Sequence, residues 1–309
     1  MDKKKSWNIT KVIIKIAVTG LSLFLVFRKV DPKDLKAAIL GSDHWFFVLA
    51  FLAFLCSQLI SSSRLNNFFR GIGLQLSEGY NFKLYLLGMF YNIFLPGGIG
   101  GDGYKVFFLR KKFGIKGRKL VTALFFDRLS GLWAMFVITA ALVVFIPSIG
   151  IPNWWPILAV VAGTLVYYIV VNKYFNEYAF WFVKKHLKAI GVQSFQVIAV
   201  IMILYALHFN GKFSPYLFIF LGSSLAALFP FTVGGLGARE IIIVYGSNFF
   251  GLDDHLAVLI SLTFYLISAM LSFCGSYFIF NPRALGEEKL PQDDKTEIEE
   301  MEDLLKKDE

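Results

Sequence analysis

The chain has 309 residues, of which 56% are hydrophobic and only 17% are charged, and its mean hydropathy is +0.61. Soluble domains carry roughly 25% charged residues, so this composition excludes an ordinary soluble enzyme and favours a membrane protein. The formal net charge of +9 fits cytoplasmic loops that face anionic headgroups, and nucleic acid is not needed as a partner to explain it.

Long apolar stretches predict helices that cross the membrane, since a helix needs about 20 apolar residues to span the ~30 Å hydrocarbon core. Such stretches lie near residues 9–27, 44–62, 81–95, 120–146, 155–172, 195–209, 214–232 and 256–280. The run 157–171 is apolar on every face, unlike the alternating strands of a transmembrane barrel. We therefore expect an all-α, polytopic helical bundle over residues 1–282, in a bacterial-type inner membrane.

The two ends of the chain differ from this body. No small-residue cleavage site follows the first apolar stretch, so we expect it to be retained rather than removed as a signal peptide. From residue 281 onward the chain has 5 Lys or Arg against 11 Asp or Glu. Residues 283–309 are therefore expected to form an acidic, solvated cytoplasmic tail.

Two apolar stretches end in similar glycine-rich interruptions. The first, residues 95–102, reads LPGGIGGD, and the second, residues 229–240, reads FPFTVGGLGARE. Proline lacks a backbone donor and glycine carries a large backbone entropy, so neither segment continues a regular helix. Paired interruptions in the two halves of a hydrophobic chain point to a transport site and predict an inverted repeat.

The distribution of Lys and Arg indicates how these interruptions enter the membrane. Residues 105–119 contain seven of these basic side chains, residues 173–188 contain four, and residues 147–156 contain none. Eight simple crossings with a cytoplasmic N-terminus would place the seven-charge segment outside, against the positive-inside rule.

A second threading removes this conflict. If residues 81–110 and 214–250 form re-entrant hairpins, six full spans remain, the basic segments are cytoplasmic, and the hairpins enter from opposite sides. Both termini are then cytoplasmic. The loop at residues 28–36, with four basic side chains, would lie outside on this threading. Seven to eight simple spans therefore stay open as the alternative.

Acidic and basic side chains occur as neighbours where the hydrophobic pattern disfavours charge. The three couples are Asp102 with Lys105, Asp127 with Arg128, and Arg239 with Glu240. A charge at the bilayer centre costs about 2.5 to 3.5 kcal/mol on insertion scales, so the couples predict pairing around a polar cavity. Interfacial pairs or snorkelling side chains are the alternative.

This arrangement suits an anionic headgroup. Glycine loops expose backbone amides, and a half-helix that starts after each loop has a positive end. We expect the cations to bind a phosphate and the carboxylates to hold those cations when the site is empty. Arg64 is a weaker candidate, because arginines at helix ends are commonly anchors, and Asn92 is expected to cap the first loop or donate to it. The predicted substrate-binding residues are Asn92, Gly97, Gly98, Gly100, Gly101, Asp102, Lys105, Asp127, Arg128, Gly234, Gly235, Gly237, Arg239 and Glu240.

Signatures of catalysis are missing from the sequence. The four histidines do not have the spacing of a helical zinc site, and the glycine clusters are followed by Asp102 or Arg239 rather than by the Gly-Lys-Ser/Thr of an ATP-binding loop. We expect no cofactor, no metal and no enzymatic activity.

The motifs resemble a known family. Asn92 with LPGGIGGD, Asp127-Arg128-Leu129 with Gly131, and the segment 234–240 are similar to the lysylphosphatidylglycerol synthase transmembrane-region family, also called the flippase-like domain family. The resemblance covers roughly residues 8–282. Lys105 departs from the pattern, because the family more often has Arg there, and lysine lacks the bidentate geometry of arginine.

The resemblance implies a membrane protein that moves or binds lipids. Larger members join this region to a soluble aminoacyl-transferase domain, which a 29-residue tail is too short to hold, so we do not expect lysyl transfer. The leading hypothesis is a translocator that moves an anionic phospholipid or a polyprenyl-phosphate-linked lipid between leaflets. The alternatives are a non-catalytic membrane subunit, with a lipid-modifying enzyme as partner, and a membrane-embedded lipid-phosphate transferase with Asp102 or Asp127 as base.

Overall fold

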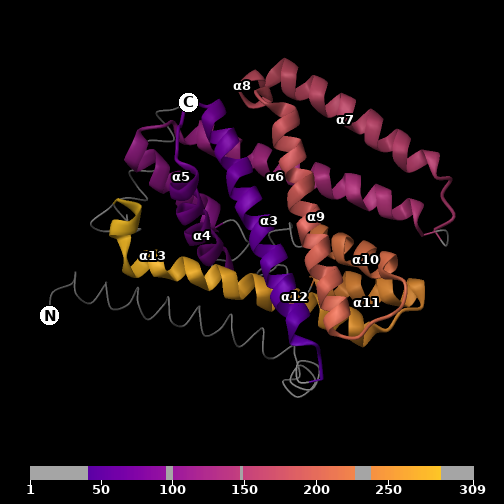
Figure 1. Cartoon of the computed structure of the whole chain (residues 1–309). Helices are drawn as coiled ribbons and strands as arrows, with labels where there is room; N and C mark the ends of the chain where they lie inside the picture. The colour runs from indigo at the N-terminus through magenta and orange to yellow at the C-terminus, as the bar shows by residue number, and fades with distance from the viewer. Residues whose placement is uncertain (1–40, 95–99, 147–148, 227–237, 287–309) are drawn as a thin grey trace.

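The computed structural model describes residues 41–94, 100–146, 149–226 and 238–286 (Figure 1). Within these ranges all regular structure is helical and no strand occurs, which confirms the predicted all-α bundle. The predicted first span at residues 9–27 and almost all of the acidic tail lie outside the described residues.

The described residues form helices that range from single turns to 28 residues. In chain order they are α3 (His44–Gly71), α4 (Glu78–Phe94), α5 (Gly100–Phe113), α6 (Gly117–Val144), α7 (Trp154–Tyr174), α8 (Asn176–Ala179), α9 (Phe182–Ala206), α10 (Phe213–Ala226), α11 (Ala238–Phe250), α12 (Asp254–Phe273), the 3-10 turn η4 (Cys274–Ser276), α13 (Tyr277–Phe280) and the 3-10 turn η5 (Pro282–Leu285).

Five segments are long and apolar enough to cross a membrane: α3, α6, α7, α9 and the stretch Asp254–Phe280. They correspond to five of the six full spans that the sequence predicts. The helix α9 begins at Phe182, well before the predicted residue 195. The prediction was too short because it treated the lysines of the first two turns of α9 as a loop.

Four helices of intermediate length form two hairpins. The helices α4, α5, α10 and α11 have 17 residues or fewer, so each rises about 25 Å or less and falls short of the ~30 Å core. The helix α4 packs on α5, and α10 packs on α11. The rings of Tyr80 and Phe113 lie 6.4 Å apart, so the first hairpin starts and finishes at the same end of the molecule.

The two hairpins enter the bundle from opposite ends. One end, here called the basic end, holds residues 110–119, 173–188 and 283–286, and Lys119 joins the first two of these segments through an ion pair of 3.0 Å to Glu177. At the opposite end the amide of Asp43 donates to the carbonyl of Ala206 at 3.1 Å, so α3 and α9 are antiparallel. The α4–α5 hairpin returns to the basic end, and the α10–α11 hairpin returns to the opposite end.

The second half of the bundle repeats the first at a constant spacing along the chain. The number of residues from the start of α6 to the start of α12 equals the number from the end of α5 to the end of α11. The glycines that follow these two hairpin helices, Gly114 and Gly251, have the same spacing, and both have a positive φ, 67° and 61° respectively. Together with the antiparallel α3 and α9, this spacing makes the described helices an inverted repeat.

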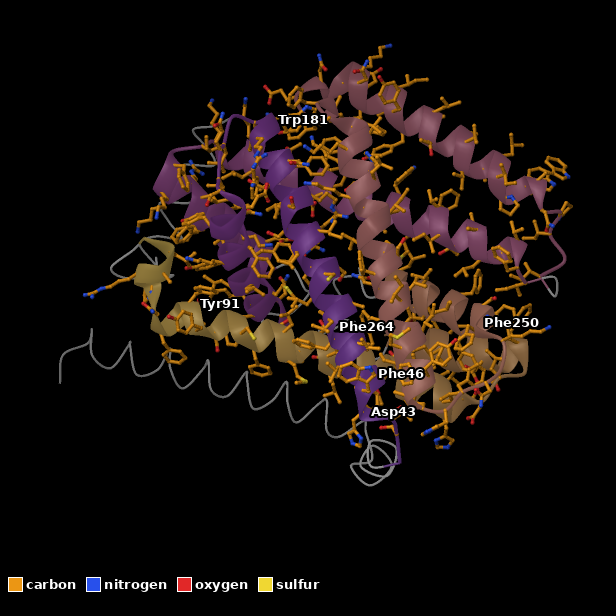
Figure 2. The ribbon with its side chains drawn as sticks, viewed as in Figure 1. Asp43, Phe46, Tyr91, Trp181, Phe250 and Phe264 are labelled. Atoms are coloured by element: carbon orange, nitrogen blue, oxygen red, sulfur yellow. The ribbon has the colours of Figure 1, made fainter. Side chains whose placement is uncertain are left out.

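The contacts between elements follow the same symmetry. The antiparallel helices α3 and α9 form the centre, with α4 and α5 on one side of it and α7 on the other (Figure 1). The last helix of each half packs on the hairpin of the other half: α6 on α10, and α12 on α4. The ring of Phe264 in α12 also meets that of Phe54 in α3 edge-on, with centroids 5.3 Å apart, which joins the halves through an aromatic contact (Figure 2).

The first hairpin is closed by a glycine that lets its helices approach each other. A Cβ atom at Gly101 in α5 would collide with the carbonyl oxygen of Gly88 in α4. A Cβ atom at Gly103, slightly further along α5, would meet nothing within 4 Å. The close approach therefore depends on Gly101 and not on glycine content in general.

We predict that Gly101→Ala destabilises the protein by about 1 to 3 kcal/mol, because the two helices must move apart to admit a methyl group. Gly103→Ala is the matched control and should leave the unfolding midpoint unchanged or slightly higher. Thermal unfolding of both variants in detergent checks this, and equal midpoints would contradict the close packing described.

Candidate functional site

Asp102 lies in the first turn of α5 and pairs with two cations. The Nζ of Lys105, one turn further along, donates to Oδ1 at 3.1 Å, and the Nε of Arg128 in α6 donates to Oδ2 at 2.7 Å. The side chains of Asp102 and Lys105 are only 13% and 5% exposed, whereas that of Arg128 is 37% exposed. The cluster is therefore a buried ion pair with one accessible cation.

Lys105 is held in place from the α4 side as well. Its ammonium group lies 4.6 Å from the ring centroid of Tyr85, and a Cβ atom at Gly88 would collide with its side chain. The hydroxyl of Tyr85 donates to the Oγ of Ser61 at 2.9 Å and lies 3.2 Å from the Oε1 of Gln58. The charged group of the hairpin is thus connected through one tyrosine to the polar face of α3.

Asn92 caps the second arm of the hairpin. Its side-chain Oδ1 accepts a hydrogen bond of 2.8 Å from the backbone amide of Gly101, in the first turn of α5. The first amides of a helix have no partner within the helix, so this bond satisfies one of them inside the membrane protein. Of the two roles that the sequence left open for Asn92, the described contact is the capping one.

A second buried ion pair joins α3 to α6. Arg64 donates to Asp127 through two parallel bonds, from Nε to Oδ1 at 2.8 Å and from Nη2 to Oδ2 at 3.1 Å. The side chains are 6% and 11% exposed. A Cβ atom at Gly131 would lie 3.4 Å from the guanidinium, so the glycine one turn after Asp127 makes room for it.

This pairing differs from the couple that the sequence suggested. Asp127 and Arg128 are neighbours in the chain, but successive helical residues point about 100° apart, so they face different partners. Asp127 pairs with Arg64, and Arg128 pairs with Asp102. Arg64, the weaker candidate from sequence, belongs to a fully formed buried pair rather than to a surface anchor.

The third basic candidate lies in the other half of the repeat. Arg239, in the first turn of α11, is 9% exposed, and its guanidinium carbon lies 5.4 Å from the ring centroid of Phe220 in α10. It also lies within electrostatic range of Tyr265 in α12. At the spacing of the repeat, Arg239 corresponds to Asp102 and Tyr265 corresponds to Arg128. The two halves therefore hold corresponding positions but not the same charge.

The structure brings together five of the predicted residues: Asn92, Gly101, Asp102, Lys105 and Arg128. Gly100 begins the same helix. Gly97, Gly98, Gly234, Gly235 and Gly237 lie outside the described residues, as does the side chain of Glu240.

Three further residues, which were not predicted from the sequence, connect the cluster to α3: Tyr85, Gln58 and Ser61. The available signal was the pair of polar residues, Gln58 and Ser61, three positions apart and therefore on one face of an apolar helix. No group of three His, Cys, Asp or Glu side chains in the described part of the chain is arranged to hold a metal ion.

The sequence model of the family described as "Lysylphosphatidylglycerol synthase TM region" matches residues 12–275. The chain belongs to this family. The resemblance seen in the glycine-rich motifs is thereby confirmed, and the matched region contains both ion pairs and both hairpins. A search of curated proteins finds no match.

The two kinds of ion pair in this lysylphosphatidylglycerol synthase transmembrane-region protein allow a controlled comparison. We predict that Asp127→Asn destabilises it by about 3 to 5 kcal/mol, because Arg64 would keep its charge in a buried site without a counter-ion. The control is Glu78→Gln, which breaks an exposed pair with Arg70 of the same 2.8 Å length. That change should cost less than about 1 kcal/mol. Denaturant unfolding in detergent measures both, and a similar loss in the two variants would contradict the account.

Proposed function

We propose that this protein moves an anionic lipid, a phospholipid or a polyprenyl-phosphate-linked lipid, between the leaflets of its membrane. The observation that carries the proposal is the Asp102 cluster, a buried carboxylate that holds two cations, one of them partly exposed, where a half-helix starts. The acyl chains remain in the bilayer while the headgroup passes the hairpins. The proposal assigns no covalent chemistry to the chain, which acts as a translocator and not as an enzyme.

Charge balance supports an anionic headgroup. Asp102, Lys105 and Arg128 carry a formal charge of +1 together, so a phosphodiester with one negative charge brings the cluster to neutrality. The partly exposed Arg128 offers the first contact, and the phosphate then replaces Asp102 as its partner. Asp102 keeps the cations paired when no lipid is bound, which lowers the penalty of holding them within the membrane.

The inverted repeat supports movement between two sides. Hairpins that enter from opposite ends give each leaflet a related approach to the centre of the bundle, as in transporters built from inverted repeats. Arg239 stands at the position in the second hairpin that corresponds to Asp102 in the first. We assign to it the headgroup contact on the side from which the second hairpin enters.

We further propose that the basic end faces the cytoplasm, in a bacterial-type inner membrane. The segments 105–119 and 173–188 both lie at that end and carry eleven Lys and Arg between them, whereas the connection at residues 207–212 carries one. This asymmetry supports the orientation through the positive-inside rule, and with it a cytoplasmic position for the end of the described chain at residue 286.

The orientation predicts a labelling pattern. In a background of Cys56→Ser and Cys274→Ser, Lys212→Cys should react with a membrane-impermeant maleimide added outside intact spheroplasts. Lys116→Cys should react only after the membrane is opened, because it lies at the basic end. Labelling of Lys116→Cys in intact spheroplasts would reverse the proposed orientation.

The function predicts loss of transport at the cluster. Asp102→Asn, Arg128→Ala and Arg239→Ala should each lower the rate of lipid movement at least about tenfold, because the headgroup loses a partner or the cations lose their balance. The matched control is Arg118→Ala, an exposed arginine that precedes Arg128 on the same helix, which should keep the wild-type rate.

The measurement uses purified protein in liposomes with a headgroup-labelled anionic lipid and a membrane-impermeant quencher. Size-exclusion profiles equal to wild type establish that each variant is folded. Wild-type rates in all three cluster variants would remove the proposed site. A protein that purifies with a stoichiometric partner and moves no lipid would instead be a non-catalytic membrane subunit.

A further inference from the structure

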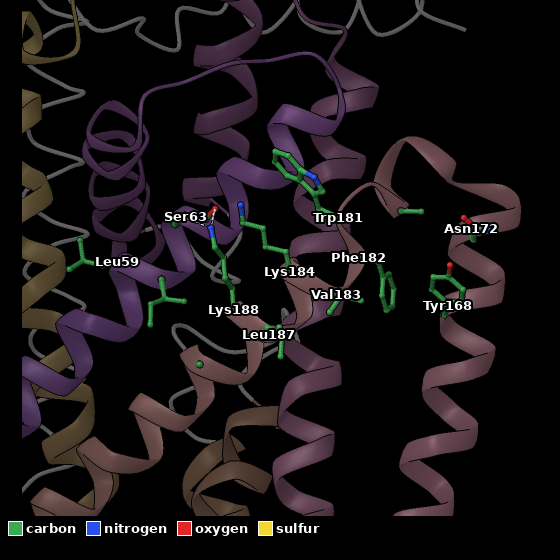
Figure 3. A pocket seen from close by; sticks show the side chains of 13 residues that line it. Leu59, Ser63, Tyr168, Asn172, Trp181, Phe182, Val183, Lys184, Leu187 and Lys188 are labelled. Atoms are coloured by element: carbon green, nitrogen blue, oxygen red, sulfur yellow. Dashed lines mark hydrogen bonds between the residues drawn. The ribbon is translucent and has the colours of Figure 1, made fainter.

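A second candidate binding site lies between α3, α7 and α9, close to the basic end (Figure 3). It is a cavity of about 1010 Å³. On α3 it is lined by Leu59, Ile60 and Ser63, whereas Gln58 and Ser61 of the same helix face Tyr85 of α4. The cavity and the hairpin cluster therefore use different faces of α3.

Two lysines lie at one side of this cavity, one helical turn apart on α9. The ammonium of Lys184 lies 4.7 Å from the ring centroid of Trp181, and the Nζ of Lys188 donates to the Oγ of Ser63 at 2.7 Å. Figure 3 shows both lysines beside Ser63 and Trp181. These contacts hold both ammonium groups at defined positions beside the cavity, where they can bind an anion together.

The surroundings leave this positive charge uncompensated by the cavity itself. None of the described residues that line the cavity is acidic. Glu78 lies within electrostatic range of Lys188, but its carboxylate already pairs with Arg70 at 2.8 Å. The cavity therefore carries a net positive charge toward the end of the bundle where Trp181 precedes α9.

The rest of the lining is apolar and continues along the helices. Leu187 lies between the two lysines on α9, Gly191 follows them about one turn later, and Leu59 lines the cavity from α3. The side chains of Leu187 and Leu59 are exposed, and both belong to helices that are long and apolar enough to cross a membrane. A cationic mouth near the membrane surface, with apolar residues beside it and about one turn beyond it, has the polarity of a phospholipid.

We propose that this cavity binds one anionic phospholipid from the leaflet at the basic end, with its phosphate between Lys184 and Lys188 and an acyl chain along Leu59 and Leu187. Basic pockets between membrane helices bind anionic headgroups in this way. The site is separate from the hairpin cluster and does not depend on lipid movement. It holds a resident lipid that wedges between α7 and the α3–α9 pair.

Trp181 provides a local readout. Purified protein is reconstituted in phosphatidylcholine with increasing fractions of phosphatidylglycerol brominated on its upper acyl chain, and in parallel with brominated phosphatidylcholine alone. The difference in tryptophan quenching between wild type and Trp181→Phe isolates Trp181 from the other five tryptophans. We expect the anionic lipid to quench Trp181 at a mole fraction about 25-fold lower than the zwitterionic lipid, since each of the two lysines contributes about 1 kcal/mol.

The lysine variants test the cause of this preference. Each lysine contributes roughly fivefold in affinity for an anionic surface, so Lys184→Ala with Lys188→Ala should abolish the preference, and Lys184→Gln alone should reduce it about fivefold. The control, Lys111→Ala with Lys116→Ala, removes two charges from the same end but outside the cavity. It should keep the preference.

Two results would overturn the proposal. The first is equal quenching of Trp181 by the two lipids in the wild type. The second is a control variant that loses the preference as fully as the cavity variant, which would assign the effect to general surface charge. If the double cavity variant does not fold, Lys184→Gln carries the same test, because Lys184 is exposed and makes no buried hydrogen bond to the described part of α3.

Discussion

A carboxylate buried within a membrane protein needs positively charged partners. The rest of this structure depends on how Asp102 obtains them. Asp102 lies at the start of a half-helix, accepts from Lys105 and Arg128, and is almost fully buried. An isolated charge in hydrocarbon is costly, so the buried carboxylate of Asp102 and the buried ammonium of Lys105 are each stabilised by an ion pair. The pairing brings α5 to α6, and Tyr85 extends it through α4 to α3. The polar cluster is therefore also what orders the first half of the bundle.

The glycine-rich hairpin follows from the same constraint. Lys105 reaches Asp102 only because Gly88 leaves space on α4, and α5 approaches α4 only because Gly101 has no side chain. The second hairpin keeps the architecture at the spacing of the repeat but carries Arg239 where the first carries Asp102. An inverted repeat with unlike charges at corresponding positions gives two related but unequal approaches, which suits a lipid whose headgroup must be released as well as bound.

Much of the fold could be predicted from the sequence, because hydrophobic length and Lys/Arg distribution act over whole segments. The count of basic residues favoured hairpins over simple crossings, and the described helices have that arrangement. The partners of individual charges could not be predicted in the same way. Asp127 and Arg128 are adjacent in sequence, yet helix geometry sends one to Arg64 and the other to Asp102. The start of α9 was also missed, since a membrane helix can carry Lys184 and Lys188 in its first turns where a cavity and a neighbouring serine receive them.

The most direct test of the account is headgroup selectivity in one preparation. Wild-type protein is placed in liposomes that contain two headgroup-labelled lipids, one anionic and one zwitterionic, and the fraction of each that becomes accessible to an impermeant quencher is followed over time. The account predicts that the anionic lipid becomes accessible well beyond its outer-leaflet fraction, while the zwitterionic lipid behaves as in protein-free liposomes. Equal acceleration of both would contradict recognition by the Asp102 cluster, and acceleration of neither would contradict lipid movement by this chain.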